Sequence, residues 1–111
     1  MAYVPQRGEI VWLTFTPQAG YEQTGRRPAL VLSPGAYNSR AGLALLCPIT
    51  RQAKGDPFEV EIPNGLAVTG IILVDQVKSL DWRARTAEPD PRVPKGTLAE
   101  VKAKLLSLIE G

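Results

Sequence analysis

The sequence predicts a mainly β protein, with several short antiparallel strands in a small barrel or sandwich and one helix at the C-terminus. Short apolar runs rich in β-branched residues recur through most of the chain, as in strands. Glycine and proline, ten of each among 111 residues, divide the chain into short segments. Apolar residues recur at helical spacing only near the end, where they predict an amphipathic helix.

Three strands are predicted in the first half of the chain. Residues 8–15 should direct Val11, Leu13 and Phe15 into the core, because alternate side chains of a strand share a face. Trp12 lies on the other face, where packing against a neighbour is favoured over stacking on a base. Residues 27–33 form the second strand. Residues 43–49 form a third that is apolar on both faces and therefore central or covered.

The connections and the fourth strand follow from local signals. A turn-rich segment with one short helical turn is expected at residues 36–40, between the second and third strands. Thr50 stands at the end of the third strand, where its hydroxyl can point outward. Residues 58–62 alternate strictly between apolar and polar, which predicts a half-exposed strand.

The second half of the chain ends in a helix. Residues 71–80 begin as a buried strand and turn polar, which would place Gln76 and Lys78 on one face as the wall of a site. Residues 88–94 are rich in proline and predict an irregular connection. Thr97 and Glu100 have the spacing of a capping box, so the helix is expected over residues 97–110.

Length and composition are those of an ordinary globular protein, with 44% hydrophobic and 22% charged residues. We expect one domain over residues 1–111, with one core and no linker. A single cysteine, Cys47, excludes an internal disulfide and fits a reducing compartment. The sequence has no apolar run of membrane-spanning length and no signal-peptide pattern, so we expect the protein in the cytoplasm.

The absence of histidine restricts the chemistry, because histidine is the commonest general acid or base and the commonest transition-metal ligand. With a single cysteine as well, a zinc site is not expected, and neither is any other cofactor. Arginine and lysine outnumber acidic residues in the first half of the chain, which could therefore face phosphates. From charge counting alone, a solvated surface with scattered arginines is the better interpretation.

The densest group of polar residues lies at residues 20–28, between the first two strands. It contains Glu22, Gln23 and two consecutive arginines, Arg26 and Arg27. Pro28 disfavours the helical conformation for the residue before it, so Arg27 should begin the second strand in an extended conformation. The carboxylate is thus expected on a glycine-flanked turn and Arg27 on a firm strand.

Several motifs in register resemble the MazF/PemK family of toxin endoribonucleases. They are Gly-Tyr-Glu-Gln-Thr-Gly-Arg-Arg-Pro-Ala-Leu-Val-Leu-Ser at 20–33, Cys-Pro-Ile-Thr at 47–50, Lys-Gly-Asp-Pro-Phe-Glu-Val at 54–60 and Asp-Gln-Val-Lys-Ser-Leu-Asp-Trp-Arg-Ala-Arg at 75–85. The resemblance runs from about residue 8 to the end of the chain. Independent motifs in the right order are far more specific than one short motif.

The resemblance implies a fold, an activity and partners. Members of the family are cytoplasmic homodimers with an SH3-like barrel, as in the related CcdB toxins, and a cognate MazE-like antitoxin blocks the site. They cut single-stranded RNA without a metal, leaving a 2′,3′-cyclic phosphate and a 5′-hydroxyl. The nucleophile is therefore the 2′-hydroxyl of the RNA itself.

In the family's motif, the arginine before the proline and the threonine that closes the third strand are the catalytic pair, which here are Arg27 and Thr50. A planar guanidinium can hold two phosphate oxygens, and a hydroxyl can donate to a developing oxyanion. We predict Glu22 as the general base, because it is the only carboxylate of the loop. A plain loop salt bridge is the alternative for Glu22.

Other residues are candidates for binding RNA. Tyr21 replaces the serine expected before the family's glutamate, and a phenol could stack on a base. The candidates for reading base edges are Gln23 and Gln76, and those for holding phosphates are Arg51, Lys54 and Lys78. Trp82, Arg83 and Arg85 could stack on or bind RNA, or form an interface with a second subunit.

Two other functions remain compatible with the sequence. One is a gyrase-binding toxin of the CcdB type, which shares the fold but has no need of the residues Glu22, Arg27 and Thr50. The other is a noncatalytic barrel that binds single-stranded RNA. Cleavage of RNA in chelator, or its absence, distinguishes both from the ribonuclease.

Overall fold

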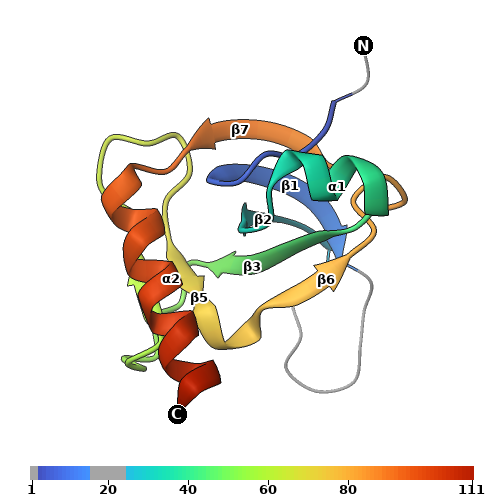
Figure 1. The fold of residues 1–111 in the computed structure, drawn as a ribbon. Helices are drawn as coiled ribbons and strands as arrows, with labels where there is room; N and C mark the ends of the chain where they lie inside the picture. Colours follow the sequence, from blue (N-terminus) through green and yellow to red (C-terminus); the bar gives the residue numbers. More distant parts are fainter. Residues whose placement is uncertain (1–2, 16–24) are drawn as a thin grey trace.

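The computed structural model describes residues 3–15 and 25–111 as a twisted antiparallel sheet with two helices (Figure 1). In chain order its elements are β1 (Glu9–Phe15), β2 (Gly25–Val31), α1 (Gly35–Ala41), β3 (Ala44–Thr50), β4 (Glu59–Glu61), β5 (Ile71–Leu73), the short 3-10 helix η1 (Val74–Gln76), β6 (Lys78–Leu80), β7 (Glu88–Arg92) and α2 (Lys95–Glu110). The predicted class, mainly β with a C-terminal helix, is confirmed. Among these residues, no helix is long and apolar enough to cross a membrane.

The strands are hydrogen-bonded in the order β4-β5-β3-β2-β1-β7, and β6 pairs separately with β3. Strands β4 and β7 stand at opposite ends of this order, so the expected barrel is not closed by strand pairing. Helix α2 packs between the two ends instead. Its Val101 lies in one cluster with Val60 of β4 and with Val93, the residue after β7.

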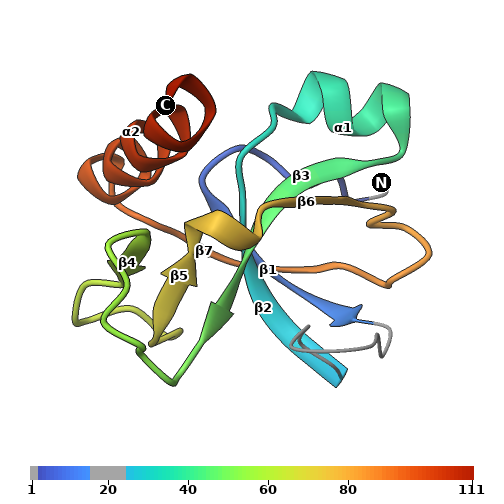
Figure 2. The same ribbon diagram turned by 90° about the horizontal axis from the view of Figure 1, so that it is seen from below.

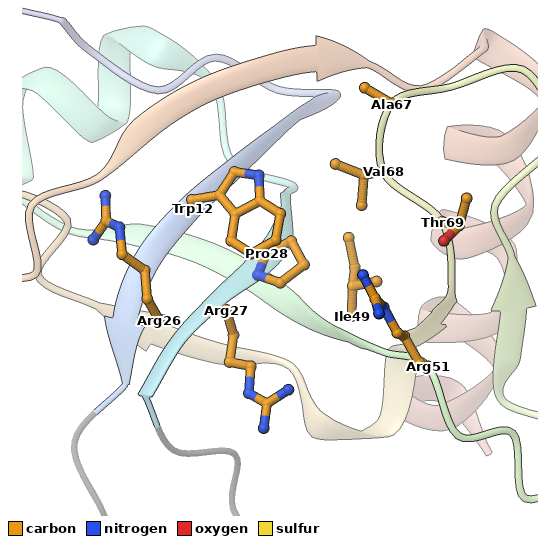
Figure 3. A pocket seen from close by; sticks show the side chains of 9 residues that line it. All are labelled: Trp12, Arg26, Arg27, Pro28, Ile49, Arg51, Ala67, Val68 and Thr69. Carbon is orange, nitrogen blue, oxygen red and sulfur yellow. The ribbon is translucent and has the colours of Figure 1, made fainter.

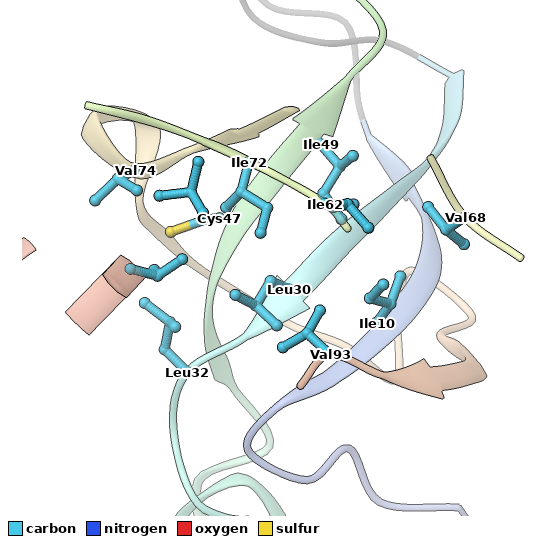
Figure 4. Close-up of a cluster of buried hydrophobic side chains, with 12 residues drawn as sticks. Ile10, Leu30, Leu32, Cys47, Ile49, Ile62, Val68, Ile72, Val74 and Val93 are labelled. Atoms are coloured by element: carbon cyan, nitrogen blue, oxygen red, sulfur yellow. The ribbon is translucent and has the colours of Figure 1, made fainter. Parts of the chain in front are cut away.

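The described residues bury two apolar clusters, whereas one core was expected from the sequence. The cluster beneath α2 (Figure 4) comprises Ile10, Leu30, Leu32, Cys47, Ile49, Val60, Ile62, Val68, Ile72, Val74, Val93 and Val101. The second comprises Val11, Leu13, Phe15, Ala29, Val31, Ala44, Leu46 and Trp82. Strand alternation assigns the two sets to opposite faces of the sheet. Both faces of β1 are therefore covered, although only one was predicted to be.

The predicted continuous strand at residues 71–80 is wrong. It is two strands, β5 and β6, separated by η1. Both strands pair with β3, with Lys78 of β6 opposite Leu46 and Ile72 of β5 opposite Ile49. The segment from Ile72 to Lys78 is therefore longer than the segment of β3 that it faces. The additional residues of the facing chain form η1. Gln76 ends η1 and Lys78 begins β6, so strand alternation does not place them on a common face.

Two boundaries near the C-terminus also differ from the prediction. The proline-rich segment contains strand β7, which pairs with β1 at the end of the strand order. Proline is tolerated there because an edge strand has one side without ladder hydrogen bonds. Helix α2 begins at Lys95 after Pro94, without a side-chain cap. Thr97 is buried in its first turn and does not form the predicted cap.

Strands β2 and β3 pair only over part of their length, and this positions the site. Their register runs from Val31 opposite Leu46 to Ala29 opposite Pro48. Beyond that point β3 pairs with β5, with Thr50 opposite Ile71, and the start of β2 and the end of β3 separate (Figure 2). The two segments predicted to carry the catalytic pair therefore form the two sides of an opening.

Candidate functional site

A pocket of about 230 Å³ lies where β2 and β3 separate. The described residues that line it are Trp12, Arg26, Arg27, Pro28, Ile49, Arg51, Ala67, Val68 and Thr69. In Figure 3 the indole of Trp12 overlaps Pro28 on one side, and Val68, Ile49 and Arg51 face them from the other. Trp12 and Pro28 are cross-strand partners in β1 and β2, which explains their contact. Among the described residues, the pocket is thus lined by apolar side chains and by three arginines.

The two consecutive arginines have different surroundings because they point to opposite faces of β2. Arg26 lies opposite Thr14 and Arg27 lies opposite Leu13. The Arg26 guanidinium donates to the Thr86 carbonyl at 2.6 Å and forms an ion pair with Glu88 of β7. In Figure 3 the Arg27 guanidinium extends the other way, away from Trp12. Arg26 therefore ties β2 to the β7 segment, whereas Arg27 lies exposed at the start of β2.

Thr50 is the last residue of β3, as predicted, and is partly exposed. Its Oγ1 accepts a hydrogen bond from the backbone N–H of Gln52 at 3.2 Å. The backbone of Gly70 passes so close that a Cβ there would lie 2.5 Å from the Thr50 carbonyl oxygen. Gly70 also has φ +136°, a conformation that other residues rarely adopt. Glycine at this position therefore allows β5 to hold Thr50 in place.

Arg27 and Thr50 occupy matching positions on the two strands. Each lies two residues beyond the last β2–β3 pair, Ala29 opposite Pro48, and so belongs to the same face as that pair. The two neighbours of Thr50, Ile49 and Arg51, line the pocket together with Arg27. The structure thus brings the predicted catalytic pair to the two sides of one opening.

The predicted RNA-contacting residues are dispersed. Arg51 lines the pocket and is exposed. Lys54 is exposed in the following loop, where its backbone N–H donates to Glu59. Lys78 of β6 lies over the ring of Phe15, with 5.8 Å between its Nζ and the ring centroid. Gln76 is partly buried at the end of η1. Of the predicted RNA-contacting residues that the structure describes, only Arg51 lines the pocket together with Arg27.

Three predicted residues, Glu22, Tyr21 and Gln23, lie outside the described residues. Their roles remain predictions from the sequence. Among residues 3–15 and 25–111, no three His, Cys, Asp or Glu side chains are grouped as cation ligands.

The Trp82 segment is part of the scaffold. Trp82 is 4% exposed, and its Nε1 donates to the Asn38 carbonyl at 3.0 Å. Arg83 stacks on the Trp82 ring with 4.7 Å to its centroid, and Arg85 donates to the Thr14 carbonyl at 3.0 Å. Burial excludes Trp82 from stacking on RNA, which corrects that alternative.

Sequence reasoning missed the third wall of the pocket, which is formed by Ala67, Val68 and Thr69. The available signal was the pair of glycines on either side, Gly65 and Gly70, which predicts a turn but not what the turn covers.

The thiol of Cys47 is buried in the cluster beneath α2. Burial raises its pKa to about 12, with a smaller contribution from the charge of Asp75. A buried thiol with a raised pKa keeps its proton at neutral pH and is a poor nucleophile.

An incompletely closed antiparallel sheet with a C-terminal helix, and an arginine-lined pocket where two strands separate, define a small β protein with a cationic pocket. Comparison with known proteins specifies the family. Residues 6–109 match the model of the PemK-like, MazF-like toxins of type II toxin-antitoxin systems. The chain belongs to this family.

Similar proteins agree with this assignment. The chain is 48% identical over 107 residues to the endoribonuclease toxin MazF of Escherichia coli K12, covering 96% of each chain. A crystal structure of MazF from Deinococcus radiodurans superposes with a TM-score of 0.93 at 57% identity, covering 99% of this chain and 100% of that one. A MazE-MazF structure from the same organism matches with a TM-score of 0.88 at 52% identity, covering 99% and 100%.

Proposed function

We propose that this protein is an endoribonuclease toxin that cuts single-stranded RNA through attack of the 2′-hydroxyl on the adjacent phosphate. The family and the names of its relatives support the class of activity. The observation that carries the mechanism is the position of Arg27 and Thr50 on the two sides of the opening between β2 and β3. A phosphate between them would meet a guanidinium and a hydroxyl at once.

Each residue of the pair has a distinct task. The Arg27 guanidinium holds two nonbridging phosphate oxygens and stabilises the charge that develops on them. The Thr50 hydroxyl donates a hydrogen bond to the same group. The 2′-oxygen forms a bond to phosphorus as the bond from phosphorus to the 5′-oxygen breaks. The leaving 5′-oxygen takes up a proton, so the products are a 2′,3′-cyclic phosphate and a 5′-hydroxyl.

Glu22 is our candidate for the general base that removes the proton of the 2′-hydroxyl. A carboxylate near Arg27 would stay ionised at neutral pH and could accept that proton. This role rests on the sequence motif. Among the other candidates, Arg51 and Lys54 follow Thr50 along the chain and would hold neighbouring phosphates, as would Lys78. Tyr21, Gln23 and Gln76 would contact bases.

The partners follow from the same relatives. A MazE-MazF complex superposes on this chain, so we propose a MazE-like antitoxin that covers the site and a homodimeric toxin. We further propose that residues 1–111 act as one domain in the cytoplasm, which is where the RNA substrate would be met. The gyrase-binding alternative is not favoured, because the curated relatives MazF, PemK and ChpB are named as endoribonucleases.

The direct test is incubation of the purified protein with a long single-stranded RNA in the presence of a chelator. Discrete fragments are expected from the wild type. Intact RNA across substrates of diverse sequence would reject the proposal. A gyrase supercoiling assay run in parallel tests the alternative, and no inhibition is expected.

A further inference from the structure

We propose that the pocket lined by Trp12, Arg51 and Val68 binds a single base of the RNA substrate, stacked on the indole of Trp12. This inference rests on the proposed function, because it names a specificity subsite beside the bond that is cut. It makes Trp12 a substrate-binding residue and not only a packing residue.

The shape of the pocket suits one planar group. The indole of Trp12 and the ring of Pro28 form one wall, and Ile49 and Val68 form the opposite wall (Figure 3). Trp12 is partly exposed and contributes to the lining of the pocket. The volume of about 230 Å³ is below the roughly 300–1,000 Å³ that encloses drug-sized ligands. It therefore suits one base and not a longer segment.

The positive charge at the pocket suits the phosphate group of the nucleotide that carries the base. Among the described residues, its lining includes three arginines and no carboxylate. The charge of Arg26 is already engaged by Glu88. Arg51 is exposed, and in Figure 3 its guanidinium lies beside Ile49 at the cavity. A base inserted between Trp12 and Val68 would leave its phosphate near Arg51, as expected for a nucleotide.

The position of the pocket assigns the base to a nucleotide next to the cut. Trp12 lies directly opposite Pro28, and Arg27 is the preceding residue of β2. Residues along a strand are separated by about 3.4 Å. Strand alternation places this stacking surface and the Arg27 side chain on opposite faces of β2, at adjacent positions beside the opening between β2 and β3, and Arg27 still contributes to the lining of the pocket. A base held there belongs to a nucleotide that flanks the phosphate bound by Arg27.

Tryptophan fluorescence tests this directly, because the chain has two tryptophans and Trp82 is buried. The probe is a single-stranded 2′-O-methyl RNA of mixed sequence, which lacks the nucleophile and cannot be cut by the proposed mechanism. The wild type should lose indole fluorescence on binding. A Trp12→Phe variant retains only Trp82 and should bind within a few-fold of wild type, measured by anisotropy of a labelled probe, without this quenching.

Two further variants measure the contribution of stacking. Trp12→Leu removes the aromatic surface and should weaken probe binding about tenfold, since stacking on one aromatic side chain is of that size. Ala67 is exposed at the pocket, so Ala67→Phe should block the pocket without disturbing the core and should weaken binding similarly. Thermal melting of each variant checks that it is folded.

Cleavage mapping distinguishes this inference from the function on which it rests. Sequencing the 5′-hydroxyl ends made by Trp12→Leu should show a relaxed base preference at one position next to the cut. The inference is overturned if wild-type protein cuts RNA while the folded Trp12→Leu and Ala67→Phe variants bind and cut with unchanged affinity and preference. In that case the pocket serves another partner. Absence of cutting by wild type would instead count against the proposed function.

Discussion

Arg26 and Arg27 are consecutive residues of β2, yet they serve opposite faces of the sheet. Arg26 lies opposite Thr14 and is held by Glu88 and the Thr86 carbonyl. Arg27 lies opposite Leu13 and extends the other way from the strand (Figure 3). The alternation of a strand thus separates a structural arginine from the arginine that we assign to the phosphate.

Arg27→Ala should lower the rate of RNA cleavage roughly 100-fold to 1,000-fold, because it removes charge stabilisation from the transition state. The melting temperature should change little, since Arg27 is exposed. Arg40→Ala, which removes an exposed arginine of α1, is the matched control and should cut at the wild-type rate. Equal rates for Arg27→Ala and wild type would remove Arg27 from the mechanism.

Arg26→Ala should act on stability. The variant loses the ion pair with Glu88 and the hydrogen bond to the Thr86 carbonyl, which together tie β2 to the segment of β7. We expect the free energy of unfolding to fall by about 1 kcal/mol, because the groups are partly exposed. Urea unfolding measures this change. A larger loss of stability in Arg27→Ala than in Arg26→Ala would contradict the division of roles.

Replacement of Gly70 should disturb the end of β3 through a defined clash. A Cβ at Gly70 would lie 2.5 Å from the Thr50 carbonyl oxygen, so Gly70→Ala must displace Thr50 and should slow cleavage. Gly65→Ala is the matched control, because Gly65 also has positive φ but a Cβ added there would meet no atom within 4 Å. Both variants are strained, by about 1–2 kcal/mol for the backbone. Only Gly70→Ala should also lose activity, measured on folded protein.

Two substitutions of Thr50 distinguish the contribution of its hydroxyl to the cleavage rate from the contribution of its side-chain shape. Thr50→Val keeps the branched side chain and removes the donor, so we expect a loss of roughly 100-fold in cleavage rate. Thr50→Ser keeps the hydroxyl and should retain most of the activity. Thr50→Val also removes the acceptor for the backbone N–H of Gln52, whereas Thr50→Ser keeps it, so the melting temperatures of both variants are measured alongside. Activity lost equally in both variants would contradict a role for the hydroxyl.

The raised pKa of Cys47 predicts how the stability of the protein depends on pH. Burial raises the pKa of this thiol from 9.0 to about 12, so the native protein holds its proton at pH values where the unfolded chain loses it. Stability from this group is complete below about pH 9 and falls as pH rises toward 12. Urea unfolding at a series of pH values should show this decline in wild type, and a smaller one in Cys47→Ala. A thiol reagent at pH 8 should label only unfolded protein.

Local patterns predicted much of the fold. The alternation at residues 8–15 and 58–62 located β1 and β4, and Pro28 correctly indicated the extended conformation of Arg27. β7 was missed because its two prolines are incompatible with an inner strand, and only its place at the sheet edge permits them. η1 was missed because it arises from the different registers of β5 and β6 against β3, which no local pattern encodes.

The candidate site was predicted only in part, for a similar reason. The motifs identified Arg27, Thr50 and Arg51, which lie at strand ends and have local signals. Trp12 was assigned to packing, and no local pattern singled out Val68. Their meeting at one pocket depends on the separation of β2 and β3, a tertiary feature.

The most direct test of the account uses an RNA with one known cut site and a matched RNA with 2′-deoxyribose at the nucleotide whose 2′-hydroxyl attacks. Wild-type protein in chelator should cut the first into a 2′,3′-cyclic phosphate and a 5′-hydroxyl, identified by mass spectrometry, and should leave the second intact at that position. Cutting of the deoxy-substituted RNA there, or a 5′-phosphate on the product, would contradict the claim that Arg27 and Thr50 steady a phosphate attacked by its own ribose.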